Sequence, residues 1–202
     1  MDIERSHHAL APPERPLRDQ LAGIGSTRPG LRLSEVESLR VVAVRMLPGA
    51  DTAWVAGLRE AGVGGLPEPG RCEGQAVRAL WRSPTEVWLV TQQGDLLDGV
   101  LRALRPGMNP AACAIDHSAG TVGIELQAPD VSGFLAHLVD PCGIPAQPGQ
   151  ATRARCMDLG VVLMRLDEQR IWLLADRPVA GYLVAWLRVT ADRTAVPVAP
   201  GA

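Results

Sequence analysis

The sequence is poor in aromatic residues and has no clustered cysteines. Only 3% of its 202 residues are aromatic, comprising five Trp, a single Tyr (Tyr182) and a single Phe (Phe134). A folded core must therefore rely on Leu, Val, Ala and Trp. No C-x-x-C pair brings metal ligands together, so we expect ordinary reduced thiols and no zinc site in this chain. The four cysteines are Cys72, Cys113, Cys142 and Cys156.

Long hydrophobic runs and an excess of charge of one sign are also missing. No window reaches the roughly 18 uninterrupted apolar residues that a membrane-spanning helix needs. Residues 1–20 are polar and lack the apolar stretch of a secretory signal peptide. A net charge of −2 gives no basic surface for nucleic acid or for an anionic membrane. These absences predict a cytoplasmic protein without a nucleic-acid or membrane partner.

Composition divides the chain into three parts. Residues 1–36 are rich in Pro, Arg and Ser, and predict an extended N-terminal arm with a short helix near residues 17–24. Residues 37–189 form the folded body, which is long enough to bury a core. Residues 190–202 have the Pro, Ala and Thr texture of a disordered tail.

Within the body, a hairpin pattern occurs twice, about 84 residues apart, at residues 80–90 and 163–174. Each copy is an apolar strand, a polar turn and a second strand that carries a Trp. An amphipathic helix is expected after each hairpin, over residues 95–104 and 178–189. Pro178 suits the first turn of the second helix, because its missing N–H would be unpaired there anyway.

A strand and a helix also precede each hairpin. They are residues 40–46 and 51–61 in the first copy, and residues 121–127 and 129–139 in the second. Strand 40–46 is nearly all apolar and β-branched, which predicts a central strand covered on both faces. A further strand over 111–116 closes the first copy, whereas the closing strand of the second copy is not evident.

This order predicts an α+β protein of two tandem ferredoxin-like β-α-β-β-α-β units, with halves at about 39–117 and 119–189. The alternative is a chance match between two short hairpins. The matching order of the flanking helices favours the repeat.

Two polar segments contain residue types that are found in active-site motifs. The glycine-rich segment 23–30 lacks the Lys-Ser/Thr of a phosphate-binding loop and follows no strand, so a linker is the better interpretation. Asp116-His117-Ser118 sets an acid, a base and a nucleophile side by side. Adjacent strand residues point to opposite faces, which prevents a working triad and favours a structural turn.

Other candidates also have simple structural explanations. Cys142 has no neighbouring cation in the sequence to lower its pKa, which favours an inert loop cysteine. Arg153 and Arg155 share one face of an expected strand, where they could clamp a carboxylate or line a partner interface. The tryptophans fit core or half-buried sheet positions. We therefore assign no catalytic, cofactor-binding or metal-binding residue from the residue pattern.

Several landmarks in order give the sequence a family resemblance. They are the hairpin at 80–90, similar to L-W-x-x-P-x-E-W-L with Val87 interposed, the D-x-S of residues 116–118, the helix over 128–138, the strand entry at 149–153, and Trp172 with the closing helix to residue 187. From about residue 39 to 187, the chain resembles the gamma subunit of heterotetrameric sarcosine oxidase, in the glycine-cleavage T-protein superfamily. Two departures are the lone Asp140-Pro141 in place of D-L-H-P and an N-terminal arm without a clear family counterpart.

The resemblance implies a T-protein-like fold and a subunit that carries no cofactor itself. It implies larger flavin- and NAD-binding partner subunits and a small zinc subunit, which together hold FAD, FMN, NAD, tetrahydrofolate and zinc. Such a complex demethylates sarcosine oxidatively and passes the one-carbon unit to tetrahydrofolate. The alternative is a self-sufficient aminomethyltransferase or folate-binding protein. The sequence lacks the Asp-Asp pair that catalytic family members carry.

Overall fold

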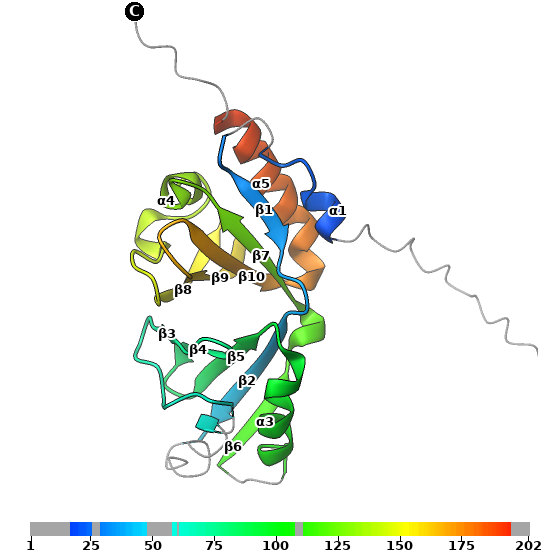
Figure 1. The fold of residues 1–202 in the computed structure, drawn as a ribbon, viewed down its shortest axis with the longest axis vertical. Helices are drawn as coiled ribbons and strands as arrows, with labels where there is room; N and C mark the ends of the chain where they lie inside the picture. Colours follow the sequence, from blue (N-terminus) through cyan, green and yellow to red (C-terminus); the bar gives the residue numbers. More distant parts are fainter. Residues whose placement is uncertain (1–16, 26–28, 48–57, 60, 108–110, 195–202) are drawn as a thin grey trace, which may run out of the picture.

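A computed structural model describes residues 17–25, 29–47, 58–59, 61–107 and 111–194. Two five-stranded sheets face each other, and the helices lie on their outer sides (Figure 1). Apolar clusters fill three layers: outside the first sheet, between the two sheets, and outside the second. The expected α+β architecture is confirmed.

The β2 sheet is built from residues 40–116. Its order is β3-β4-β5-β2-β6, with every neighbouring pair antiparallel. Strand β2 lies between β5 and β6, with Val42 and Val44 facing the helix-side cluster and Val41 facing the other sheet. The prediction that this strand is internal and covered on both faces is confirmed. The strands are β2 (Arg40–Met46), β3 (Cys72–Glu73), β4 (Arg78–Ser83), β5 (Glu86–Thr91) and β6 (Ala112–Asp116).

The β7 sheet has the order β1-β7-β10-β9-β8, again antiparallel throughout. Its β9–β10 hairpin agrees with the one expected over 163–174. Its outer strand next to β7 comes from the N-terminal segment, with Arg32 opposite Gln127 and Glu35 opposite Ile124. The strands are β1 (Arg32–Glu35), β7 (Thr121–Gln127), β8 (Ala151–Cys156), β9 (Leu159–Arg165) and β10 (Arg170–Asp176).

The N-terminal segment corrects the prediction of an extended arm over residues 1–36. Helix α1 (Leu17–Leu21) buries both of its leucines against the layer that holds α5. Ile24 and Leu31 join the same apolar cluster, and β1 follows directly. Residues 17–25 and 29–36 therefore belong to the folded body, whereas residues 1–16 and 26–28 lie outside the described residues.

The outer face of the β2 sheet is covered by η1 (Gly94–Leu97) and α3 (Asp98–Ala103) (Figure 1). This agrees with the helix expected over 95–104, except that its first turn is 3₁₀. Leu97, Val100 and Leu104 bury its apolar stripe. Of the helix expected over 51–61, Leu58 and Arg59 are helical, and residues 51–57 and 60 lie outside the described part of the chain.

Helix α4 (Val131–Leu135) is shorter than the helix expected over 129–139. The Asp130 side chain accepts a hydrogen bond from the Gly133 N–H and caps its start. After Leu135 the chain continues in a turn, and Val139 forms an isolated β-bridge with Cys156 of β8. The helix therefore ends before residue 139, because the residues after Leu135 turn towards the edge strand β8.

The C-terminal helix is longer than expected. After η4 (Arg177–Val179), helix α5 (Ala180–Thr194) continues five residues beyond the predicted end at 189. Thr190 and Ala191 are buried in this extension. The prediction of a disordered tail is thus wrong for residues 190–194, and residues 195–202 are not described. Among the described residues, no helix is long and apolar enough to cross a membrane.

Candidate functional site: a charged cleft between the two sheets

The Asp116-His117-Ser118 segment forms a hydrogen-bonded turn between β6 and η2 (Ser118–Gly120). Asp116 Oδ1 accepts hydrogen bonds from the Ser118 N–H at 2.9 Å and from the Ser118 hydroxyl at 2.5 Å. The Ser118 hydroxyl oxygen in turn accepts from the Val41 N–H at 3.0 Å. These contacts fasten the end of β6 to the start of β2 and support the structural interpretation of the segment.

His117 does not face Ser118. Its ring stacks on Trp88, with the ring centroids 6.2 Å apart and the planes at 23°. Its Nε2 is buried without a hydrogen-bond partner among the described residues. The fold thus keeps Asp116 and Ser118 hydrogen-bonded to each other, while the His117 ring packs on Trp88.

The cysteines have raised pKa values where a shift is resolved. Asp140 Oδ1 accepts a hydrogen bond from the Cys142 N–H in η3 (Pro141–Gly143), and the Asp140 carboxylate raises the pKa of the Cys142 thiol. Burial raises the pKa of Cys72 and of Cys156 to about 11 each. These three thiols are therefore protonated at neutral pH, which makes them poor nucleophiles. Within the described residues, no three His, Cys, Asp or Glu side chains are grouped to hold a metal ion.

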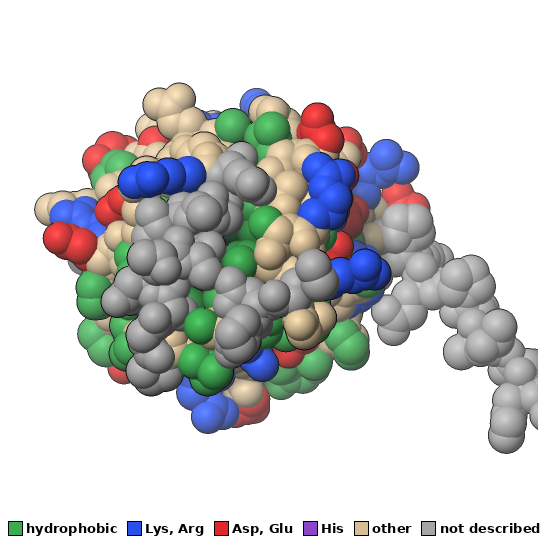
Figure 2. All heavy atoms as spheres, turned by 90° about the horizontal axis from the view of Figure 1, so that it is seen from below, with side chains coloured by type: hydrophobic (Ala, Val, Ile, Leu, Met, Phe, Trp, Pro, Cys, Tyr) green, Lys and Arg blue, Asp and Glu red, His purple; other side chains and the backbone are tan. Residues whose placement is uncertain are grey.

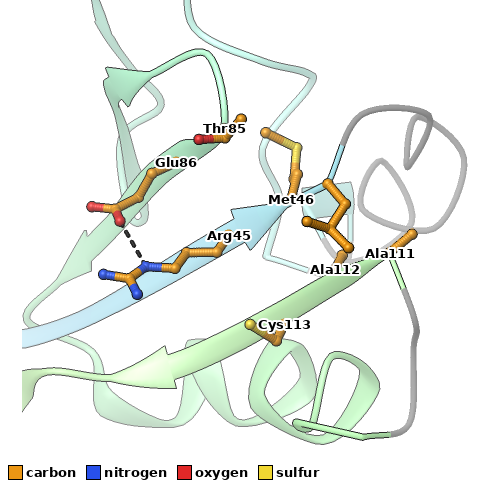
Figure 3. A pocket seen from close by; sticks show the side chains of 8 residues that line it. Arg45, Met46, Thr85, Glu86, Ala111, Ala112 and Cys113 are labelled. Atoms are coloured by element: carbon orange, nitrogen blue, oxygen red, sulfur yellow. Dashed lines mark hydrogen bonds and ion pairs between the residues drawn. The ribbon is translucent and has the colours of Figure 1, made fainter.

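One pocket of about 550 Å³ lies where β2, the β4–β5 turn and β6 meet (Figure 3). Arg45 and Glu86 form an ion pair of 2.8 Å on one side, and Met46 and Ala112 lie on the other. The view from below Figure 1 shows hydrophobic side chains in green among charged and other polar ones on the described surface (Figure 2). The pocket's lining residues Leu47 and Ala111 are next in the sequence to segments 48–57 and 108–110, which the structure does not describe, so we assign the pocket no ligand.

A second cleft, of about 340 Å³, lies between the two sheets. It differs from the first pocket in carrying two guanidinium groups from opposite sheets. The β2 sheet contributes Arg82 and Trp88 to its lining, and the β7 sheet contributes Arg153, Val162, Leu174 and Asp176.

The β7 sheet places its side chains by strand register. Arg153 on β8 lies opposite Val162 on β9, which lies opposite Leu174 on β10. These three residues form a row on the face that points to the β2 sheet, where Val162 and Leu174 are buried. Arg155 shares the face of Arg153, as expected, but its guanidinium lies beside Asp158 instead of lining the cleft.

The β2 sheet places Arg82 by a bulge. Trp81 is opposite Val87, and Ser83 is opposite Glu86, so Arg82 is the extra residue between two paired positions. A bulge re-aims a side chain and often occurs beside functional sites. The Arg82 guanidinium carbon lies 4.2 Å from the centre of the Trp88 ring, which is a cation–π contact.

The two positively charged groups of the cleft, Arg82 and Arg153, repel each other. The pKa of Arg82 is lowered first by burial and next by the positive charge of Arg153, against the opposing effects of Glu86 and Asp176. The Arg82 side chain is 14% exposed, and its Nε is buried without a hydrogen-bond partner among the described residues.

Glu86 does not neutralise Arg82 fully. Its nearest oxygen is 3.9 Å from Arg82 Nε, whereas it accepts hydrogen bonds from Trp88 Nε1 at 3.0 Å and from Arg45 Nε at 2.8 Å. The carboxylate is thus engaged mainly with Arg45 and the indole. An arginine remains protonated at neutral pH, so the cleft keeps two positive groups.

Sequence reasoning identified one member of this cleft and missed the others. The two-residue period of a strand placed Arg153 and Arg155 on one face. It could not place Arg82, because a bulge interrupts that period, and it could not predict that His117 packs on Trp88.

Of the glycine-rich segment 23–30, residues 26–28 are not described; Gly25 and Gly30 have positive φ angles of 80° and 81°.

No protein-family model and no curated protein sequence matches the chain. Among solved structures, a chain of the heterotetrameric sarcosine oxidase from Corynebacterium sp. U-96, in complex with pyrrole 2-carboxylate, superposes with a TM-score of 0.78 at 23% identity. That match covers 93% of this chain and 98% of the other. The fold is T-protein-like.

The aminomethyltransferase T of the glycine cleavage system from Bartonella henselae is a second similar structure. It superposes with a TM-score of 0.57 at 17% identity, and the match covers 85% of this chain but 48% of that chain. The fold resemblance expected from the sequence motifs is therefore confirmed.

Proposed function

We propose that the protein is a gamma-type, non-catalytic subunit of a multi-subunit, flavin-dependent oxidoreductase that resembles sarcosine oxidase. The observation that carries this proposal is the end-to-end match to a chain of a heterotetrameric sarcosine oxidase, which covers 93% of this chain and 98% of that one. A subunit that supports the assembly and stability of a complex acts through its whole surface rather than through a local motif. This chain and the sarcosine oxidase chain share their whole fold.

The chemistry of the described side chains supports a non-catalytic role. Ser118 is engaged with Asp116 and the Val41 N–H, and His117 lies on Trp88 instead of beside that hydroxyl. Nucleophilic catalysis needs a base within hydrogen-bond reach of the nucleophile.

In the proposed complex, larger partner subunits bind FAD, FMN, NAD and tetrahydrofolate, and a small subunit binds zinc. The complex demethylates sarcosine or a related secondary amine oxidatively and transfers the one-carbon unit to tetrahydrofolate. A cytoplasmic location fits that chemistry.

A second candidate is a self-sufficient aminomethyltransferase or folate-binding protein. The observation that favours it is the likeness to aminomethyltransferase T, which extends over 85% of this chain. The chain spans about half the length of that protein.

We also infer that the two sheets derive from two ferredoxin-like units in tandem. The support is the placement of the β4–β5 and β9–β10 hairpins at corresponding positions, each next to the strand that opens its half, β2 or β7. The second unit would take its fourth strand, β1, from the N-terminal segment rather than from its own end.

Co-expression tests the proposal. The tagged chain is produced together with the proposed flavin- and NAD-binding subunits and the proposed zinc subunit, and the complex is isolated by affinity and size-exclusion chromatography. We expect one stable assembly that oxidises sarcosine or a related secondary amine. A chain that stays alone in this experiment, yet transfers aminomethyl groups to tetrahydrofolate by itself, would establish the second candidate instead.

A further inference from the structure

The inter-sheet cleft has an unmatched positive charge. Two guanidiniums, of Arg82 and Arg153, line it together with one carboxylate, that of Asp176. One positive charge is left over within this group of described residues. A monoanion would balance the group, whereas a dianion would overshoot it.

The donors of the cleft are already in place for such an anion. The cation–π contact with Trp88, itself packed on His117, holds the Arg82 guanidinium against the β2 sheet. The buried Arg82 Nε has no hydrogen-bond acceptor among the described residues, and an unmatched buried donor is costly. The Arg153 guanidinium has no hydrogen-bond or ion-pair partner among the described residues, and it approaches from the opposite sheet.

The wall between these two cations is apolar. Val162 is 5% exposed and Leu174 is 1% exposed, and both lie in the row that begins at Arg153. A volume of about 340 Å³ is at the small end of the range for ligand sites. The cleft therefore combines two guanidinium donors with a compact apolar wall.

We propose that this cleft is a binding site for a small monocarboxylate, held between Arg82 and Arg153 with its apolar part against Val162 and Leu174. A carboxylate has two oxygens, so it can accept from both guanidiniums at once, and charge-assisted hydrogen bonds of this kind are about twice as strong as neutral ones. The site belongs to this chain alone and does not depend on the proposed partner subunits.

The same carboxylate chemistry has two possible sources, a free small molecule or an Asp or Glu side chain of another protein. Benzoate represents the first source, and N-acetyl-aspartate N-methylamide represents the second. Benzamide, which has the shape of benzoate without its charge, is the matched neutral compound.

The test is a titration of the full chain with each compound. Binding is monitored through the NMR signals of the arginine Nε–H groups and by calorimetry. We expect saturable binding of at least one carboxylate, none of benzamide, and shifts of the Arg82 and Arg153 signals. The carboxylate that binds more tightly identifies the source.

Two variants on the same face of β8 separate the cleft from its surroundings: Arg153→Gln changes the site, and Arg155→Gln is the control. Arg153→Gln should weaken carboxylate binding at least about tenfold, because it removes a charge-assisted hydrogen bond. Arg155→Gln, on the same face of β8 but outside the cleft, should leave the affinity within about twofold. Both residues are exposed, so folding is preserved, and Arg82→Gln can be added where circular dichroism shows a native fold. Absence of binding by both carboxylates, or equal affinity in the two β8 variants, would overturn the proposal.

Discussion

At the scale of single residues, the layer between the sheets depends on Trp172. Its side chain is 7% exposed and packs with Val41, Leu80 and Met164, residues that come from both sheets. Its Nε1 donates to Glu125 Oε2 at 2.8 Å, which satisfies the indole N–H. The residue therefore contributes both packing and a matched hydrogen bond to the contact between the sheets.

Replacement of Trp172 by Ala should lower the free energy of unfolding by about 3–5 kcal/mol, because it leaves a large cavity in a close-packed layer. Urea denaturation of the two proteins measures the difference. Trp88→Ala should cost less, since Trp88 is half-buried beside the open cleft. A Trp172→Ala protein within 1 kcal/mol of the parent, about the cost of an ordinary substitution, would contradict this assignment.

Asp116 gives the fold a dependence on acid. Burial tends to raise the pKa of this carboxyl, but hydrogen bonds from Ser118 and the charge of Arg40 outweigh burial and hold the pKa below its ordinary value. A lowered folded-state pKa stabilises the protein at pH values above the unfolded-state pKa, near 4. That contribution is lost as the pH falls through the lowered pKa of the folded state.

Asp116→Asn should therefore reduce the loss of stability between neutral pH and about pH 3, because the asparagine does not titrate. Chemical denaturation at a series of pH values measures this slope. Asp192→Asn, on the exposed side of α5, serves as the matched control. An unchanged slope in Asp116→Asn would show that the turn does not favour the charged carboxylate.

The residue scale also shows where sequence reasoning succeeds and fails. The turn at Asp116 and Ser118 could be predicted, because short polar side chains bond to nearby backbone groups. The shared face of Arg153 and Arg155 followed from the period of a strand. The position of Arg82 depends on a bulge, which one extra residue in a strand creates and which no local pattern reveals.

At the scale of elements, the N-terminal segment is the main correction. Strand β1 has four residues, none of them fully buried, and its partner β7 follows about 90 residues later. A short, polar edge strand gives no alternation strong enough to predict. The apolar residues Leu17 and Leu21 are one helical turn apart, but a helix of five residues is below the length that periodicity can establish.

A chain that begins at Glu37 should be strongly destabilised, which reverses the expectation from an extended arm. It loses β1 and the buried side chains of Leu17, Leu21, Ile24 and Leu31. Burial of each such side chain stabilises a fold by about 1.5–3 kcal/mol, so we expect the melting temperature to fall by about 10 °C or more.

Calorimetry of the truncated and complete chains measures this effect. Leu21→Ala in the complete chain should reproduce part of the loss, whereas Arg18→Ala, an exposed residue of the same helix, should not. A truncated chain that melts within about 2 °C of the parent would show that residues before Glu37 do not stabilise the folded body, as expected of an extended arm.

Helix ends were the other difficulty at this scale. The start of α4 followed from its Asp130 cap, which the structure contains. Its end, and the extension of α5 to Thr194, depend on tertiary packing: Val139 meets Cys156, and Ala191 is buried in the outer layer of the β7 sheet. Composition alone assigned the Pro- and Ala-rich residues after 189 to a tail, although their first turn is packed.

At the scale of the whole molecule, two sheets and their outer helices form a layered α+β body that matches a sarcosine oxidase chain nearly end to end. The order of the landmarks made that fold predictable, whereas the contact between the sheets was not. Side chains from both halves meet there, and only the three-dimensional arrangement brings Arg82 and Arg153 to one cleft.

The most direct test of the proposed role compares the oxidoreductase complex purified with and without this chain. Sarcosine-dependent oxygen consumption is measured per bound flavin, together with the yield and thermal half-life of the assembled complex. A non-catalytic subunit predicts nearly the same turnover per flavin in assembled complexes but a lower yield and a shorter half-life when the chain is omitted. Unchanged yield and half-life without the chain, or aminomethyl transfer that follows the isolated chain, would contradict the account.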